Sequence, residues 1–213
     1  MTRLMDKDRA EVLAKLNVSR ETLLRLDLYV ALLLRWQTMM NLVSPNTLSE
    51  MWSRHILDSA QLIHYAPAQC RRWVDLGSGG GLPGLVIAAL AEDRIGFETI
   101  LIESDRRKAA FLRSAAREMG LASRIVIRAE RAEIAVPTID GAEVVSARAL
   151  APLSDLVRLS EPLLAKGALG VYPKGESVRR ELTAWGPPGN FDVSLAPSRT
   201  HPSAAIALVR MRA

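Results

Sequence analysis

The 213-residue chain has little of what builds covalent or metal-held frameworks. It contains one cysteine, Cys70, and three histidines, His55, His64 and His201. One cysteine excludes an internal disulfide framework and any cysteine-based metal site. The histidines are too few and too scattered to indicate a zinc site, and a surface or capping role is expected for each. The sequence therefore predicts a protein without a metal centre.

Long hydrophobic runs and aromatic residues are also scarce. The longest apolar run near the N-terminus, residues 28–34, is far shorter than the roughly 20 residues that cross a bilayer. No signal peptide precedes it, so we expect a cytoplasmic protein with no membrane partner. Aromatic residues make up 5% of the chain, which gives no support for a platform that stacks single-stranded bases.

Positive charge, by contrast, is in excess. The formal net charge is +5 and basic residues cluster at 106–108, at 124–131 and at 179–180. Any one cluster is ordinarily a solvated face, but together with a bias toward arginine they make nucleic acid the leading partner class.

The most informative segment is the glycine-rich stretch 75–84, with sequence DLGSGGGLPG. It follows a short apolar run and leads into another, as expected of a strand that turns into a helix. In an open α/β sheet such a turn forms a nucleoside-sized cleft at the carboxyl edge of the strands. Glycine is needed where the backbone approaches a ligand or adopts positive φ.

Three interpretations of this turn compete. Gly79, Gly81 and Gly84 match the G-x-G-x-x-G pattern of dinucleotide-binding proteins, which place a pyrophosphate at the helix N-terminus. Asp75 stands where that negative charge would have to be accommodated, and it better suits a positively charged ligand such as S-adenosylmethionine (SAM). A tight turn without a ligand is the third.

A second acid, Glu103, ends the apolar run 98–102, close to the spacing of roughly 20 residues that places a carboxylate on a ribose. We expect Glu103 to accept hydrogen bonds from the ribose hydroxyls. The alternative is a cap for the helix that begins near Asp105, a role that Ser104 or Asp105 could also fill.

The order of predicted elements indicates one α/β fold. Residues 1–66 form a helical extension in which Ser19 is an N-cap, residues 41–46 interrupt the pattern, and a third helix spans about 48–65. Residues 67–213 form a doubly wound, mostly parallel Rossmann-like sheet of the kind found in SAM-dependent methyltransferases, closed by an antiparallel C-terminal hairpin. The predicted strands are 72–76, 98–103, 124–129, 142–147, 168–172, 191–196 and 204–211, and the predicted helices of this part are 83–91, 105–119, 152–164 and 175–185.

Several segments together resemble one family. In order and spacing, five segments resemble those of the bacterial RsmG (GidB) family. They are Asn41-Leu42-Val43-Ser44, Arg54-His55-Ile56-Leu57-Asp58-Ser59, the glycine turn with Leu82-Pro83-Gly84, Glu103 to Lys108 with Phe111-Leu112, and Ser146 to Leu153. The similarity covers nearly the whole chain. Members of this family are 16S ribosomal RNA methyltransferases that transfer a methyl group from SAM to N7 of a guanine in the 530 loop.

The motifs of the glycine turn and Glu103, together with the resemblance, imply a set of site residues and a partner. The residues expected to contact SAM are Asp75, Gly77, Ser78, Gly79, Gly81, Leu82, Glu103, Ala129, Glu130 and Arg148. Four residues are candidates for positioning the substrates: Arg148, Lys174, and His55 and Asp58, which lie three apart on one helix face. The sequence departs from the family pattern at Pro173, because the family usually has an aliphatic residue before this lysine. The expected partner is 16S rRNA, within the small ribosomal subunit or an assembly intermediate, and the protein is expected to act as a monomer.

The chemistry of guanine N7 explains why no catalytic nucleophile or general base stands out. N7 carries an in-plane lone pair and no proton, so alignment with the methyl donor can suffice. An NAD-dependent oxidoreductase would need a proton-relay residue near the strand ends, and none is evident. A noncatalytic RNA-binding module would tolerate loss of the glycines.

Overall fold

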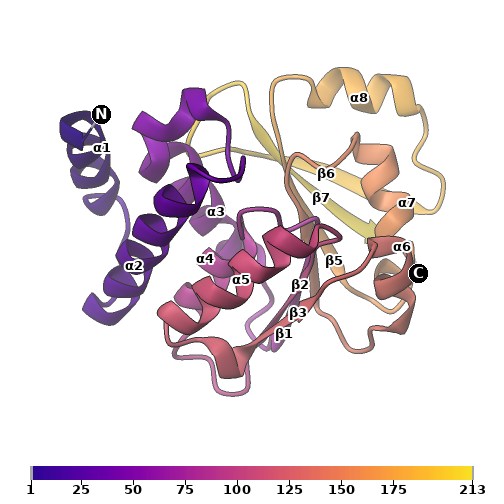
Figure 1. Ribbon diagram of the computed structural model, residues 1–213. Helices are drawn as coiled ribbons and strands as arrows, with labels where there is room; N and C mark the ends of the chain where they lie inside the picture. Colours follow the sequence, from indigo (N-terminus) through magenta and orange to yellow (C-terminus); the bar gives the residue numbers. More distant parts are fainter. Residues whose placement is uncertain (1, 213) are drawn as a thin grey trace.

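The computed structural model describes residues 2–212 and consists of one mixed sheet with helices on both faces (Figure 1). The seven strands run in the order β3-β2-β1-β4-β5-β7-β6. Neighbours from β3 to β5 are parallel, and β7 joins both β5 and β6 in antiparallel fashion. The strand bounds are β1 Arg72–Leu76, β2 Glu98–Ile102, β3 Ile125–Arg128, β4 Val144–Ala147, β5 Leu169–Lys174, β6 Phe191–Pro197 and β7 Ala205–Met211. The predicted fold class is confirmed.

Helices on the two faces bury different apolar clusters. On one face lie α4 (Gly84–Leu90) and α5 (Arg106–Glu118), whose buried side chains form one cluster with the N-terminal helices. On the other face α7 (Leu153–Leu164) and α8 (Val178–Trp185) share a second cluster with the short helix α6 (Ala132–Ala135) and the 3-10 turn Val136–Thr138. The sequence did not predict α6 or that turn, because each is shorter than the window over which helical periodicity can be recognised.

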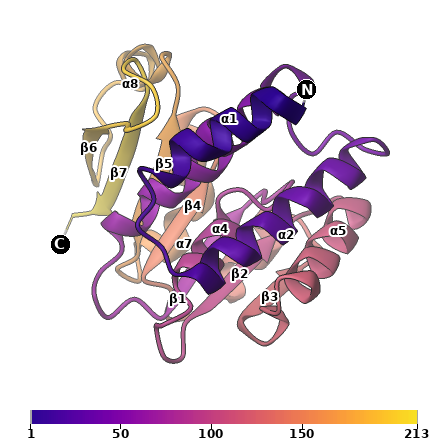
Figure 2. The same ribbon diagram turned by 90° about the vertical axis from the view of Figure 1, so that its left-hand side faces the viewer.

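The N-terminal helices are packed onto the sheet domain. Helix α1 spans Thr2–Leu13 and α2 spans Arg20–Gln37, and both lie along the same side of the molecule (Figure 2). Ser19 is the N-cap of α2, as predicted, and its Oγ accepts a 2.9 Å hydrogen bond from the backbone N–H of Thr22. Among the described residues 2–212, no helix is both long and apolar enough to cross a membrane.

The predicted regular helix over 48–65 is wrong in detail. The structure has a 3-10 turn at Pro45–Glu50, a π-helical turn at Trp52–Leu57, one α-helical turn (α3) at Asp58–Ala60 and a further 3-10 turn at Gln61–Tyr65. The apolar spacing is helical throughout, so it cannot distinguish these windings. π-helical turns occur often at functional sites.

Candidate functional site

The site is expected at the topological switch point of the sheet, between β1 and β4, where the strand order reverses. Strand β1 connects outward to β2 and β3, whereas its other neighbour, β4, leads to β5. In doubly wound sheets, ligands bind outside the carboxyl ends of the two strands at this switch point. The glycine turn follows β1 and Arg148 follows β4, so the fold brings these two predicted site segments to one edge.

The loop after β4 lies against the glycine turn. Ala149 has φ +52°, a left-handed conformation that is uncommon for a residue with a side chain. The next residue, Leu150, is 42% exposed, and its Cδ1 would lie 2.7 Å from a Cβ added at Gly77. Gly77 therefore keeps space for the Leu150 side chain.

Asp75 faces the interior beneath the turn. Its side chain is fully buried; Oδ1 accepts a 2.7 Å hydrogen bond from Ser146 Oγ, and Oδ2 accepts a 3.3 Å hydrogen bond from Gly84 N. Burial raises the pKa of Asp75 to about 6, although the hydrogen bonds oppose this shift. The structure thus gives Asp75 a role in holding the start of α4, and its direct contact with a cofactor stays a prediction.

Glu103 connects the two loops that follow β1 and β2. Oε2 accepts from the backbone N–H of Gly79 and Oε1 from that of Asp105, each at 2.8 Å. The N-cap of α5 is Asp105, whose carboxylate accepts from the N–H groups of Arg107 and Lys108. The alternative role considered for Glu103 is therefore filled by Asp105, and Glu103 stands directly beside the glycine turn.

The glycines of the turn serve different purposes. At Gly79, with φ +52°, an added Cβ would meet only the Gly77 carbonyl oxygen, at 3.7 Å, so the space above it is open. At Gly81 and Gly84 a Cβ would clash with Leu85 and Leu101, at 2.3 and 2.2 Å. Gly79 therefore fits a position where the backbone approaches a ligand, whereas Gly81 and Gly84 allow close packing of α4.

The other predicted cofactor residues differ in exposure. Ser78 and Leu82 are buried, and Ser78 Oγ donates a 2.9 Å hydrogen bond to the Asp75 carbonyl. Ala129, just after β3, is exposed, and Glu130 forms an ion pair with Arg128. Both residues follow the carboxyl end of β3, which lies beyond β2 on the same edge.

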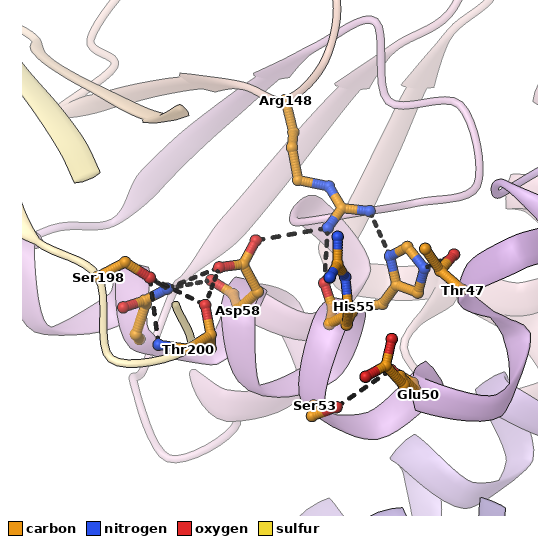
Figure 3. Close-up of polar contacts among 10 residues, drawn as sticks. Thr47, Glu50, Ser53, His55, Asp58, Arg148, Ser198 and Thr200 are labelled. Carbon is orange, nitrogen blue, oxygen red and sulfur yellow. Dashed lines mark hydrogen bonds and ion pairs between the residues drawn. The ribbon is translucent and has the colours of Figure 1, made fainter. Parts of the chain in front are cut away.

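Arg148 is held by the π-helical turn (Figure 3). Its Nη1 donates to the Arg54 carbonyl oxygen at 3.1 Å and lies 3.5 Å from Asp58 Oδ2, and its Nη2 lies 2.6 Å from His55 Nδ1. The structure thus brings together three of the four predicted positioning residues, Arg148, His55 and Asp58.

His55 is buried and neutral. It is 6% exposed, so the surface or capping role expected for this histidine is wrong. Burial, with the nearby Arg148 and Arg54 cations, lowers the pKa of His55 to about 3. At neutral pH the imidazole is therefore uncharged and a weaker base than an exposed histidine.

Asp58 also binds the C-terminal part of the chain. Its Oδ1 accepts from Thr200 Oγ1 at 2.7 Å and from Gln61 Nε2 at 2.9 Å (Figure 3). Thr200 lies in the connection between β6 and β7. One carboxylate thus joins the end of β4, the irregular helical segment and the C-terminal hairpin.

Lys174 lies away from this cluster. Its Nζ forms a 2.7 Å ion pair with Glu181 of α8 and donates to the Ala151 carbonyl oxygen at 3.0 Å. Glu181 also accepts from Leu153 N at 2.8 Å. Lys174 thus ties β5 to the starts of α7 and α8.

Sequence reasoning missed the residues that support the site from a distance. Tyr29 of α2 is fully buried, and its hydroxyl donates to the Gly80 carbonyl oxygen. Thr47 Oγ1 lies 2.8 Å from His55 Nε2. Tyr29 sits within a leucine-rich helical stripe and Thr47 in a polar loop, so neither position carried a signal. Among residues 2–212, no cluster of metal-ligating side chains is present.

Comparisons with known proteins point to one family. The model of the family described as rRNA small subunit methyltransferase G matches residues 22–186. The chain is 50% identical over 200 residues to ribosomal RNA small subunit methyltransferase G of Methylobacterium nodulans, covering 93% of each chain. It is 48% identical over 201 residues to the protein of that name from Methylorubrum populi, covering 94% of each.

Solved structures agree on the fold. The O-methyltransferase TomG from Streptomyces achromogenes, solved in complex with SAM, superposes with a TM-score of 0.62 at 17% identity, covering 94% of each chain. At this identity the likeness concerns the fold alone.

Proposed function

The chain belongs to the rRNA small subunit methyltransferase G family, and from this we propose that it transfers a methyl group from SAM to N7 of a guanine in the 530 loop of 16S rRNA. The observation that carries the proposal is that the family match spans the whole switch-point site, from α2 to α8. The glycine turn, Glu103 and Arg148 all lie within it.

The residues at the switch point fit SAM. Open space above Gly79 leaves room for the cofactor to approach the backbone, and Glu103, 7% exposed, stands beside it. A carboxylate at this position can accept from both ribose hydroxyls. Under the same proposal Ala129 and Glu130, which follow β3, lie next to the adenine of SAM. When bound, SAM supplies a sulfonium methyl group that a lone pair can accept.

The state of His55 favours a target atom that has no proton to lose. Its Nδ1 is occupied by Arg148, and its Nε2 faces Thr47. Asp75, whose pKa is also shifted, is fully buried. Neither group is free to take a proton from an exocyclic amine, and guanine N7 requires no such step. The protein's contribution is then alignment and placement of charge, and alignment can supply about 7 to 11 kcal/mol of the barrier.

The substrate we propose is 16S rRNA in the small subunit or in an assembly intermediate. In an RNA duplex the N7 edge faces a deep and narrow major groove, so the guanine is expected to be in a loop or turned outward.

The test is to map methylated nucleotides in 16S rRNA by mass spectrometry, from cells with and without this protein. We expect one 7-methylguanine of the 530 loop to disappear without it and to return with the wild-type gene. Purified protein with tritiated SAM and undermethylated subunits, naked 16S rRNA or assembly intermediates then identifies the substrate form. An unchanged modification pattern would contradict the proposal.

A further inference from the structure

The guanidinium of Arg148 is only partly used by the protein. Arginine has five N–H donors. Two bonds from Nη1 go to the Arg54 carbonyl and Asp58, and one from Nη2 goes to His55. Among residues 2–212, Nε–H and the second N–H of Nη2 have no hydrogen-bond partner. In Figure 3 the bonds from both terminal nitrogens run toward the helical segment, while Nε has none.

The two remaining donors form the side edge of the guanidinium. Nε–H and Nη2–H point in parallel and can bind two oxygens of one anion. The same pair in Arg9 binds both carboxylate oxygens of Asp27, at 2.8 and 2.7 Å. Arg148 follows β4 at the carboxyl edge of the sheet, where the glycine turn also lies, and its side chain is 19% exposed. A bidentate edge of this kind selects carboxylates and phosphates.

The bond between His55 and Arg148 can form with only one tautomer of the imidazole. A guanidinium donates and never accepts, so His55 Nδ1 must carry the lone pair and Nε2 the proton. The Thr47 hydroxyl donates to the Ser44 carbonyl at 2.8 Å and can therefore accept from Nε2–H at 2.8 Å. Thr47 thus sets the tautomer that Arg148 needs.

We propose that His55 is a positioning residue: held in its Nε2–H tautomer by Thr47, it fixes the end of the Arg148 guanidinium so that the side edge is presented to an oxyanion of the substrates. This inference rests on the proposed function. The oxyanion is either the carboxylate of SAM or a phosphate of the RNA, since guanine N7 must stay free for methylation. Because positive charge moves from sulfur to the purine during transfer, a cation fixed away from the reacting atoms is less harmful than a mobile one.

Two substitutions of His55 test separately the acceptor role of Nδ1 and the donor role of Nε2. In His55→Asn, Oδ1 lies as many bonds from Cβ as Nδ1 does and can accept from Arg148. In His55→Gln, the amide nitrogen replaces Nε2 and can donate to Thr47, but no acceptor faces Arg148. We expect His55→Asn to keep kcat/KM within a few-fold of wild type and His55→Gln to lose about 100-fold, the effect of misplacing a group by about 1 Å.

The affected parameter identifies the anion. If the anion is the cofactor carboxylate, calorimetry shows weaker SAM binding by His55→Gln, with no difference from wild type for decarboxylated SAM. If it is an RNA phosphate, SAM affinity is unchanged and KM for small subunits rises. Either result supports the proposal. Unchanged values of both, or equal losses in the Asn and Gln variants, would overturn it.

A double-mutant cycle separates positioning from a general structural role. If His55 acts through Arg148, adding His55→Gln to Arg148→Lys lowers kcat/KM little more than Arg148→Lys alone, whereas independent roles give multiplied losses.

Nitrogen NMR of the wild type should show an unprotonated Nδ1 and a protonated Nε2 for one histidine, assigned from its absence in His55→Asn. The opposite tautomer would refute the proposal. Wild-type protein that fails to bind SAM contradicts the proposed function, whereas normal binding with identical His55 variants contradicts only the role of His55.

Discussion

The hydroxyl of Tyr29 donates a 2.5 Å hydrogen bond to the carbonyl oxygen of Gly80, joining α2 to the glycine turn. In Tyr29→Phe the buried carbonyl loses this donor, so we expect a loss of about 1 to 3 kcal/mol in the free energy of unfolding. SAM affinity should fall as the turn loosens. Urea denaturation and calorimetry measure the two effects. Tyr65→Phe is the matched control, since the Tyr65 hydroxyl has no hydrogen bond among the described residues; equal behaviour of the two variants would contradict the role of Tyr29.

Gly79→Ala should abolish or strongly weaken SAM binding while the protein stays folded. The new methyl group meets no side chain, so the stability loss is limited to the left-handed conformation, about 1 to 2 kcal/mol. Gly96→Ala is the control, because Gly96 has φ +73° and open surroundings in the loop between α4 and β2. Both should unfold at similar urea concentrations, and only Gly79→Ala should lose the cofactor. Normal affinity in folded Gly79→Ala would remove Gly79 from the site.

Asp105→Ala should mainly lower stability, whereas Glu103→Ala should mainly lower SAM affinity. Asp105 caps α5, so its loss should cost about 0.5 to 2 kcal/mol of stability with little effect on SAM affinity. Glu103 bonds to Gly79 and faces the proposed ribose, so its loss should reduce affinity by more than it reduces stability. Thermal denaturation and calorimetry on both variants compare the two quantities. A collapse of stability with normal affinity in Glu103→Ala would make Glu103 a structural residue.

The stability of the protein should depend on pH through His55. Its pKa of about 3 in the folded state lies below the ordinary 6.5, so between these values the unfolded chain binds a proton that the folded protein does not. This contribution is complete above about pH 6.5 and is lost as the pH falls toward 3, by at most about 1.4 kcal/mol per pH unit. Burial is the largest cause of this lowered pKa, and the Arg148 and Arg54 cations that face the imidazole add to it. Asp58 forms an ion pair with the Arg148 guanidinium.

Urea denaturation of wild type and His55→Asn from pH 4 to 8 tests this dependence. Asp75, whose pKa rises to about 6 on folding, acts in the opposite direction in both proteins and cancels in the comparison. Below about pH 6.5 the wild type should lose stability relative to His55→Asn, so any stability advantage of the wild type over the variant should shrink as the pH falls. A constant difference would show that folding does not shift the pKa of His55.

Replacing Arg179 and Arg180 by glutamine should weaken RNA binding without affecting SAM. Both are exposed in the first turn of α8, and neither forms an ion pair within residues 2–212. If each contacts a phosphate, the salt dependence of RNA affinity should become shallower by about 1.4 to 1.8 in logarithmic slope. Filter binding at several salt concentrations measures this slope. An unchanged slope would make them solvated surface residues.

Local signals predicted the sheet and named candidate site residues that the fold brings to one edge. Glu103 is a candidate because an apolar strand, an acid and a helix follow one another directly along the chain, and the structure places it beside the glycine turn. Ser19 was recognised as a cap because a cap acts within three residues. The strand order then follows from the rules for parallel connections, which bring Arg148 beside the glycine turn.

The remaining features depend on contacts between distant segments. The contact of Asp75 with the cofactor stays a prediction, but the hydrogen bond that its carboxylate accepts from Ser146, its register partner on β4, is not encoded in any local pattern. The π-helical turn depends on packing that periodicity does not encode. Thr47 acts through His55 and Thr200 through Asp58, and no spacing in the sequence reports such pairs.

The shared core of α2, α4 and α5 also sets the order in which the chain can fold during synthesis. Leu26 and Leu33 of α2 belong to the same buried cluster as Leu85 and Phe111. When α2 emerges from the ribosome, these partners have not yet been made. Chains grow at about 5 to 20 residues per second, so α2 must wait several seconds with its apolar stripe uncovered. The N-terminal segment is therefore made first but can bury the full apolar stripe of α2 only once α5 is complete.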